Sequence, residues 1–235
     1  MLNELINILI PPVCALCERG AAKTAFCQRC EAEFEKKRIT GPACVSCCMP
    51  FPSKEAPAHR CSSCIRSEPP FSVAWSAYRY DSILLDAVHG LKYSGTTILA
   101  KGLGDLLARA ITARLPGRFD LIAPVPLHPK RLKDRGFNQS LLIARRISKL
   151  LGTPLDCFNL VRVMETEPQV NLRAKERKNN VRGAFAIKNS AVFKGRRVLL
   201  VDDVYTTGAT LCECSKALKK AGAEVFAATL ARAAV

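Results

Sequence analysis

The most informative part of the chain is the run Val198-Leu199-Leu200-Val201-Asp202-Asp203-Val204-Tyr205-Thr206-Thr207-Gly208-Ala209-Thr210. An apolar run ends in two adjacent acids and then passes through a turn rich in hydroxyl groups and glycine. The amphipathic pattern of a helix follows, from Thr210 through Leu218. This order of residue types predicts a strand, a loop and the start of a helix.

The turn has the chemistry of a phosphate receptor. Backbone N–H groups, threonine hydroxyls and the positive end of the following helix all attract a phosphate dianion. Gly208 lets the chain turn tightly without a Cβ facing the ligand. The carboxylates of Asp202 and Asp203 can accept hydrogen bonds from sugar hydroxyls about one ribose length away. Together, these groups suit a ribose 5-phosphate.

Segment 198–210 resembles the phosphoribosyl pyrophosphate (PRPP) binding motif of the type I phosphoribosyltransferases. The likeness covers the apolar strand, both acids and the Thr-Thr-Gly-Ala-Thr loop. A buried strand before a capped helix is the structural alternative, but it leaves what we expect to be an exposed acidic pair unexplained. The resemblance implies that the acids hold the ribose hydroxyls and that the loop holds the 5-phosphate. The implied PRPP ligands are Asp202, Asp203, Thr206, Thr207, Gly208, Ala209 and Thr210.

The first part of the chain has the cysteine pattern of a metal module. Four Cys-x-x-Cys pairs occur there: Cys14 and Cys17, Cys27 and Cys30, Cys44 and Cys47, Cys61 and Cys64. Each pair can place two thiolates on one tetrahedral ion, so the eight cysteines predict two closed structural zinc sites. A disulfide framework needs an oxidising compartment, and an iron–sulfur cluster usually takes four cysteines in closer series. We therefore favour zinc over both alternatives.

The order in which the four cysteine pairs combine follows from chain entropy. Pairing the first with the second and the third with the fourth closes shorter loops than an interleaved arrangement does. We therefore expect sequential pairing. Cys48 could replace its neighbour Cys47 as a ligand, whereas His59 is expected to be a solvated loop residue.

Length and composition indicate two domains. The chain has 235 residues, 49% of them hydrophobic, enough for one α/β core and a small metal-stapled module. The prolines after Glu68 predict a boundary that separates a double zinc ribbon, 1–68, from a larger domain, 69–235. No apolar run approaches the roughly 20 residues that span a bilayer. Met1 to Ile10 lacks the basic start of a secretory signal, so we expect no membrane span and a cytoplasmic protein.

Beyond residue 70, short apolar runs alternate with helical patterns. Such alternation predicts an α/β fold with a mostly parallel sheet and helices on both faces. Ligands bind beyond the carboxyl ends of the strands in these sheets, which is where Asp202 is expected. The expected strands lie near Phe71–Tyr80, Phe119–Val125, Phe158–Met164, Val198–Val201 and Val225–Leu230. The expected helices contain Leu84–Leu91, Leu99–Ile111, Ser140–Leu151 and Thr210–Leu218.

Positive charge is concentrated in one part of the chain. The net charge is +16, and positions 126–184 hold 13 Lys or Arg against 5 Asp or Glu. One basic cluster spans 130–135, in an expected loop after a strand, and a second spans 173–182. Solvated surface charge is the simpler explanation for any single lysine. As sets, the clusters suit a polyanion, and Arg131 with Arg135 is well placed to hold a pyrophosphate together with a divalent ion.

Other parts of the chain resemble the ComF family of competence-associated proteins. The matching segments are Leu9–Pro12, Leu91–Tyr93, Pro124–Gln139 and Gln169–Phe185. The resemblance implies a phosphoribosyltransferase-like domain behind a double zinc ribbon, linked to natural transformation and to the handling of incoming single-stranded DNA. It also implies PRPP with Mg²⁺ as ligands and other competence proteins as partners.

Two functions remain open at this point. In an enzyme, Arg131 and Arg135 would stabilise the leaving pyrophosphate as catalytic residues, and the basic stretch Arg173–Arg182 would be a mobile cover that excludes water. In a non-catalytic protein, the same fold would bind single-stranded DNA through its basic surface, in a salt-sensitive manner. A third interpretation treats the zinc module as a docking element alone.

Overall fold

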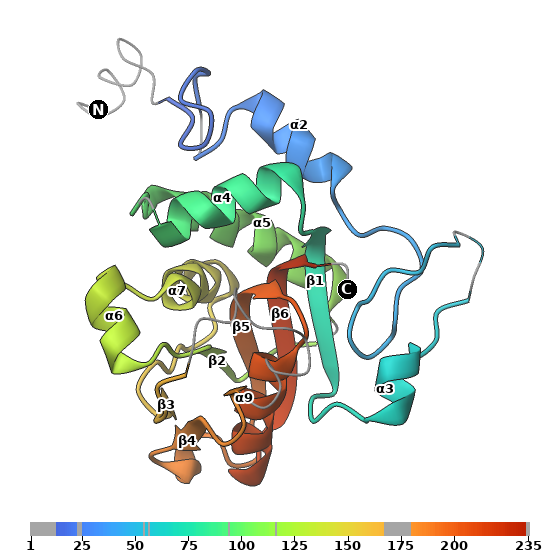
Figure 1. Cartoon of the computed structure of the whole chain (residues 1–235), viewed down its shortest axis with the longest axis vertical. Coiled ribbons are helices and arrows are strands. Elements are labelled where there is room, and N and C mark those ends of the chain that lie inside the picture. Colours follow the sequence, from blue (N-terminus) through green and yellow to red (C-terminus); the bar gives the residue numbers. More distant parts are fainter. Residues whose placement is uncertain are drawn as a thin grey trace.

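The computed structural model describes residues 13–22, 25–53, 55, 57–93, 95–115, 117–166 and 180–233. Its centre is a sheet of four parallel strands (Figure 1). In spatial order these are β1 (Val73–Arg79), β6 (Glu224–Arg232), β5 (Arg197–Tyr205) and β2 (Leu121–Pro124). The prediction of a parallel α/β sheet is therefore confirmed.

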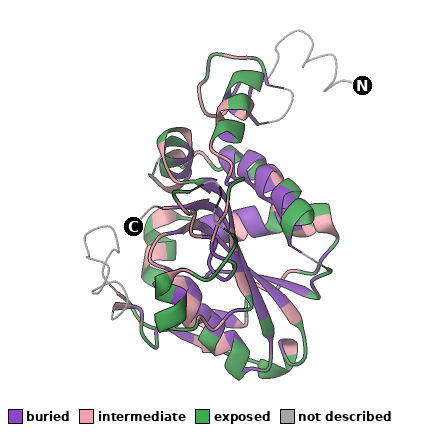
Figure 2. Ribbon diagram, turned by 90° about the vertical axis from the view of Figure 1, so that its right-hand side faces the viewer, coloured by how far each residue is buried: buried purple, intermediate pink, exposed green. Residues whose placement is uncertain are grey.

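Strand β5 runs through the middle of the sheet and is buried on both faces, which explains its nearly continuous apolar sequence. Leu199 and Val201 point to one face of the sheet, and Val198 and Leu200 point to the other. Figure 2 shows the buried strands passing through the centre of the molecule. Burial of this kind contributes about 2 kcal/mol per large aliphatic side chain.

Helices cover both faces of the sheet, as predicted. Helices α5 (Ile98–Arg114) and α7 (Gln139–Leu151) pack on the face that holds Leu199. Helix α9 (Ala209–Lys220) packs on the opposite face. Helix α4 (Ser82–Tyr93) lies across the carboxyl ends of the strands (Figure 1). Among the described residues, no helix combines the length and apolar content needed to cross a membrane.

Two elements differ from the sequence-based expectation. The basic segment expected to be a loop is a short helix, α6 (Pro129–Arg135). The strand expected near 158–164 lies outside the main sheet, because β3 (Leu160–Arg162) pairs only with β4 (Phe185–Ile187), in an antiparallel hairpin. A 3₁₀ turn at Ser190–Val192 leads from this hairpin toward β5.

The cysteine-rich part contains α2 (Gln28–Lys36) and α3 (Ser62–Arg66) and lies along β1. Backbone hydrogen bonds join it to that strand: Ala74 N donates to Ser46 O at 2.8 Å, and Arg79 N donates to Lys37 O at 2.8 Å. Cysteines of this part also belong to both hydrophobic clusters of the sheet. The metal module is thus packed against the larger domain, and the boundary after residue 68 stays a prediction.

Candidate functional site

The eight predicted metal ligands form two separate tetrads. Within each tetrad the sulfur atoms lie within 4.8 Å of one another. The first tetrad consists of Cys14, Cys17, Cys27 and Cys30, and the second of Cys44, Cys47, Cys61 and Cys64. Sequential pairing is therefore confirmed.

The sulfur spacing fits tetrahedral zinc. The Sγ atoms of Cys17 and Cys27 are 3.7 Å apart, and so are those of Cys47 and Cys61. A tetrahedron with zinc–sulfur bonds of about 2.3 Å places its corners about 3.8 Å apart. Cys48 stays outside the second tetrad, because its thiol points to Ser76 O at 3.6 Å. The exposed His59 ring stacks on Phe51 instead.

A cleft of about 1030 Å³ opens at the carboxyl end of the sheet. Its walls come from the end of β5, the start of α9, and helices α4, α6 and α7. The predicted site residues that line it are Arg131, Arg135, Asp202, Asp203, Thr206, Gly208, Ala209 and Thr210. The structure therefore brings most of the predicted PRPP ligands and both predicted arginines to one place. Thr207 is not among the lining residues, and its Oγ1 accepts a hydrogen bond from Ala209 N at 3.4 Å.

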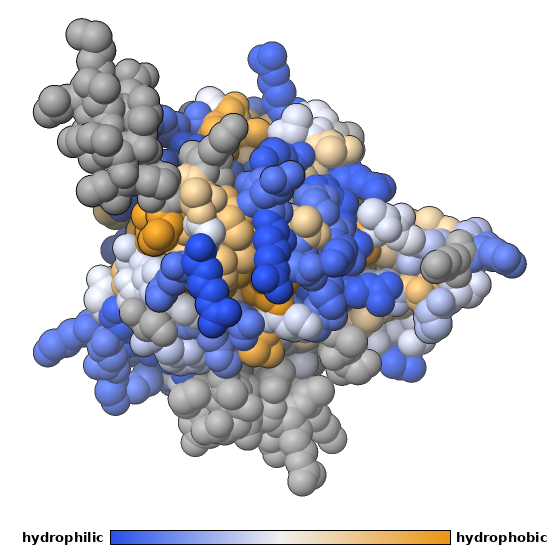
Figure 3. Space-filling model, turned by 90° about the horizontal axis from the view of Figure 1, so that it is seen from above, coloured by the Kyte–Doolittle hydropathy of each residue, from blue (hydrophilic) through white to orange (hydrophobic). Residues whose placement is uncertain are grey.

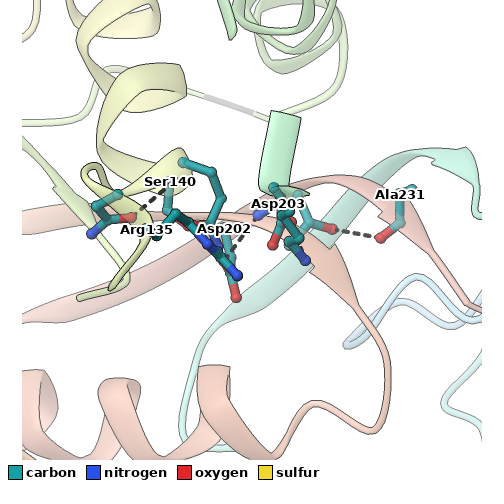
Figure 4. Close-up of polar contacts among 9 residues, drawn as sticks. Arg135, Ser140, Asp202, Asp203 and Ala231 are labelled. Carbon is teal, nitrogen blue, oxygen red and sulfur yellow. Dashed lines mark hydrogen bonds and ion pairs between the residues drawn. The ribbon is translucent and has the colours of Figure 1, made fainter. Parts of the chain in front are cut away.

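The two acids of the motif are buried, contrary to the expectation of an exposed pair. Asp202 is 8% exposed and Asp203 is 3% exposed, because β5 continues past both residues. Asp202 accepts a hydrogen bond from Ser140 Oγ at 2.8 Å, and Asp203 forms an ion pair with Lys92 of α4. Figure 4 shows Ser140 and Asp202 pointing toward each other, with Arg135 beside them.

Different partners give the two carboxyl groups different acidities. Burial and then the nearby charge of Asp203 raise the pKa of Asp202 to about 7. Burial also disfavours the charged form of Asp203, but the ammonium of Lys92 outweighs this effect and lowers the pKa of Asp203. The pair therefore holds one permanent negative charge and one that appears near neutral pH.

The phosphate loop turns at Gly208, which has φ +79° and caps the amino end of α9. A Cβ at this position would collide with the ring of Tyr205, so both the backbone conformation and the space require glycine. The first residues of α9 line the cleft. The amino end of a 12-residue helix thus faces the space where an anion would lie.

Arginine side chains also line the cleft. Arg135 donates to Gln139 Oε1 at 2.7 Å and lies 5.7 Å from the ring centre of Tyr93. Arg162 of β3 also lines the cleft although it is 93% buried. Its Nε has no hydrogen-bond partner among the described residues, and burial, followed by the charge of Arg131, lowers its pKa. The charge of Arg131 acts on Arg162 within the same cleft, and positive groups brought together in this way suit a bound anion.

The polar residues of the cleft that had no functional role in the sequence-based prediction include Lys92, Ser140 and Arg162. Lys92 lies within a segment that resembles the ComF family and Ser140 directly follows another, but their partners Asp203 and Asp202 are distant in sequence. The second basic cluster, which was expected to form a cover, lies mostly outside the described residues; Arg182 is described and exposed.

The parallel sheet, the cleft and the two cysteine tetrads are those of a phosphoribosyltransferase-like domain that carries a double zinc ribbon. Residues 138–234 match the family model described as phosphoribosyl transferase domain, and residues 5–65 match the double zinc ribbon domain. The chain is 32% identical over 225 residues to DNA utilization protein YhgH of Salmonella typhimurium, covering 92% of this chain and 94% of that protein. The chain belongs to the ComF/YhgH family.

Further relatives carry competence names. Competence protein F of Haemophilus influenzae is 33% identical over 212 residues, covering 86% of this chain and 88% of that protein. Competence protein ComFC of Bacillus subtilis is 28% identical over 211 residues, covering 88% of this chain and 83% of that protein. A purine phosphoribosyltransferase structure from Pyrococcus horikoshii is 24% identical, with a TM-score of 0.36, covering 56% of this chain and 71% of that chain.

Proposed function

We propose that the protein binds PRPP together with Mg²⁺ and transfers its phosphoribosyl group to an acceptor, with release of pyrophosphate. One observation carries this proposal. A single cleft combines the amino end of α9, two buried carboxyl groups and three arginines. These are complementary to a terminal phosphate, a sugar diol and a pyrophosphate respectively.

Each part of PRPP has a counterpart in the cleft. The 5-phosphate would lie at the loop formed by Thr206, Thr207, Gly208, Ala209 and Thr210. Asp202 and Asp203 would accept hydrogen bonds from the ribose hydroxyls. Lys92 neutralises Asp203 and has further N–H donors for an anionic ligand. Arg131, Arg135 and Arg162 would hold the pyrophosphate, and Mg²⁺ would bind with it, since carboxylate and phosphate oxygens are its preferred ligands.

The reaction needs no nucleophilic side chain. A lone pair on the acceptor forms the new bond to C1 of the ribose, while the C1–oxygen bond breaks and its electrons leave with the pyrophosphate. The acceptor's proton passes to solvent. Arg131 and Arg135 would stabilise the charge on the leaving group, and the cleft would hold both reactants in line.

Calorimetry of the zinc-loaded protein tests the proposal. We expect saturable PRPP binding that requires Mg²⁺. The variant Asp202→Asn should weaken this binding at least tenfold, by about 1.4 kcal/mol, since it loses a charge-assisted acceptor.

Asp134 provides the matched control, since it also lines the cleft but lies on exposed α6. The variant Asp134→Asn should bind PRPP as well as the unmodified protein does, or better, because it removes a negative charge beside the arginines. Absence of magnesium-dependent PRPP binding in the unmodified protein would overturn the proposal.

We further infer a cytoplasmic protein that acts in DNA uptake or utilization, alongside other competence proteins. The names of the relatives and the reducing conditions that zinc thiolates need support this inference. The net charge of +16 favours a second candidate, binding of single-stranded DNA through the basic surface. Both functions can coexist, because the exposed Lys130 and Lys133 of α6 are not among the residues that line the cleft.

A further inference from the structure

Arg232 connects the second cysteine tetrad to the phosphate loop. It is the last residue of β6, lies beside Tyr205 of β5 in the sheet register and is only 5% exposed. Its Nη2 lies 3.8 Å from Cys47 Sγ, and its Nη1 donates to Thr206 O at 3.2 Å. One buried guanidinium therefore contacts a metal-ligating sulfur and the backbone of the loop.

The connection continues to the amino end of α9. The guanidinium of Arg232 lies 3.5 Å from the ring centre of Tyr205. The same ring occupies the space where a Cβ at Gly208 would lie, so it sets how closely the loop can approach the sheet. A displacement of Arg232 would thus reach both Thr206 and Gly208, the two ends of the turn.

A metal ion in the second tetrad would hold one end of this connection in place. Four thiolates around Zn²⁺ carry a net charge of about −2, and such sites are usually stabilised by donors from neighbouring residues. Arg232 has the charge and the position of such a donor. With no metal ion, packing alone holds Cys47, and the buried guanidinium of Arg232, whose Nε lacks a partner among the described residues, loses one of the groups that fix its position.

We propose that Arg232 is a positioning residue that couples metal occupancy of the second tetrad to the geometry of the phosphate loop. Zinc in this tetrad then raises the affinity for PRPP, a consequence that rests on the proposed function. By thermodynamic linkage, PRPP raises the affinity of the same tetrad for zinc by the same factor.

The first tetrad gives an internal comparison. It belongs to the hydrophobic cluster on the opposite face of the sheet, where the ring of Phe26 lies against Gly102 of α5. Its occupancy should therefore influence α5 and leave the loop unchanged. Cys17 of the first tetrad and Cys61 of the second are both partly exposed, so substitutions of these two ligands form a matched pair.

Hydrogen exchange of the ligand-free protein tests the coupling without PRPP. We expect the amides of 205–211 to exchange about tenfold faster in Cys61→Ser and in Arg232→Lys. The lysine keeps the positive charge but cannot contact both Cys47 and Thr206. Two control variants should leave the exchange of this segment unchanged: Cys17→Ser, and Arg146→Lys, in which the altered residue pairs with Asp105 instead. Equal exchange in Cys61→Ser and Cys17→Ser would overturn the coupling.

Ligand binding supplies the second readout. PRPP affinity should fall about tenfold in Cys61→Ser and Arg232→Lys, and saturating PRPP should slow the loss of one of the two zinc ions to a chromogenic chelator. If PRPP binds but slows the release of neither zinc ion to the chelator, the coupling is wrong. If no PRPP binds while Cys61→Ser still accelerates exchange at 205–211, the coupling stands and the proposed function fails.

Discussion

At the scale of single residues, the adjacent acids of β5 differ because their side chains meet partners on different helices. Asp203 meets Lys92 of α4, whereas Asp202 meets the hydroxyl of Ser140 at the start of α7. A hydroxyl is a weaker partner than an ammonium group, so burial dominates the pKa of Asp202. The sequence shows two equal carboxylates, and only the packing of two helices makes them unequal.

This difference predicts a pH dependence of ligand binding. Asp202 is mostly neutral below pH 7 and charged above it, so its acceptor strength toward sugar hydroxyls and Mg²⁺ grows as pH rises. We expect the affinity for PRPP with Mg²⁺ to increase severalfold between pH 6 and pH 8 in calorimetric titrations. Asp202→Asn should reduce this increase to the part that comes from titration of PRPP itself.

The ligand-free protein should show the opposite trend in stability. Because the folded state raises the pKa of Asp202, it binds the proton more tightly than the unfolded chain does. The free energy of unfolding should therefore fall as pH rises from about 4 to about 7 through this group. Thermal unfolding of Asp202→Asn should lack this component, and an unaltered pH profile in that variant would contradict the assignment.

At the scale of elements, helix α6 shows a signal in the sequence that the loop prediction missed. Pro129 stands in the first turn, the side chain of His128 accepts from Lys130 N, and Gly136 closes the helix with φ +81°. Proline at the start and glycine just after the end are common helix boundaries. The hairpin of β3 and β4 gave no comparable signal, because its strands are three residues long and far apart in sequence.

Gly208 provides a prediction at the scale of one turn. Alanine there meets both an unfavourable φ and the ring of Tyr205, whereas alanine at Gly152, with φ +64°, meets open space. Both variants should lose about 1 kcal/mol of stability, because a positive φ is unfavourable for alanine. Only Gly208→Ala should also displace the loop and weaken PRPP binding, by tenfold or more in calorimetry. Equal effects of the two variants on binding would show that crowding at Tyr205 is unimportant.

At the scale of the whole molecule, the two tetrads share the core of the larger domain. Cys14 packs in the cluster with α5, and Cys44, Cys47 and Cys64 pack in the cluster with α9. A short cysteine-rich segment has little apolar area of its own, so it gains stability both from metal and from the sheet. This shared packing explains how a contact between Arg232 and Cys47 can exist at all.

The exposed lysines of α6 allow the two candidate functions to be tested separately. Figure 3, seen from above the view of Figure 1, shows long hydrophilic side chains next to hydrophobic ones on this face of the molecule. If the exposed Lys130 and Lys133 of α6 contact a nucleic-acid backbone, Lys130→Gln with Lys133→Gln should weaken binding of a single-stranded oligonucleotide. The slope of log affinity against log salt should fall by roughly 1.4, about 0.7 for each phosphate contact.

The matched variant for this test is Asp202→Asn with Asp203→Asn, which should abolish PRPP binding and leave oligonucleotide binding nearly intact. Loss of both activities in this variant, with thermal unfolding showing that it is still folded, would mean that the two ligands share one surface.

The elements with local signals could be predicted from the sequence: the strand–loop–helix motif at 198–210, the spacing of the cysteine pairs and the alternation that makes a parallel sheet. The entropy cost of closing loops was enough to predict which Cys-x-x-Cys pairs combine in each tetrad. The contacts between residues far apart in sequence could not be predicted and became visible in the folded chain, including Lys92 with Asp203, Ser140 with Asp202, and Arg232 with Cys47. These contacts depend on how helices dock on the sheet, and docking is set by packing over the whole core, which no short stretch of sequence encodes.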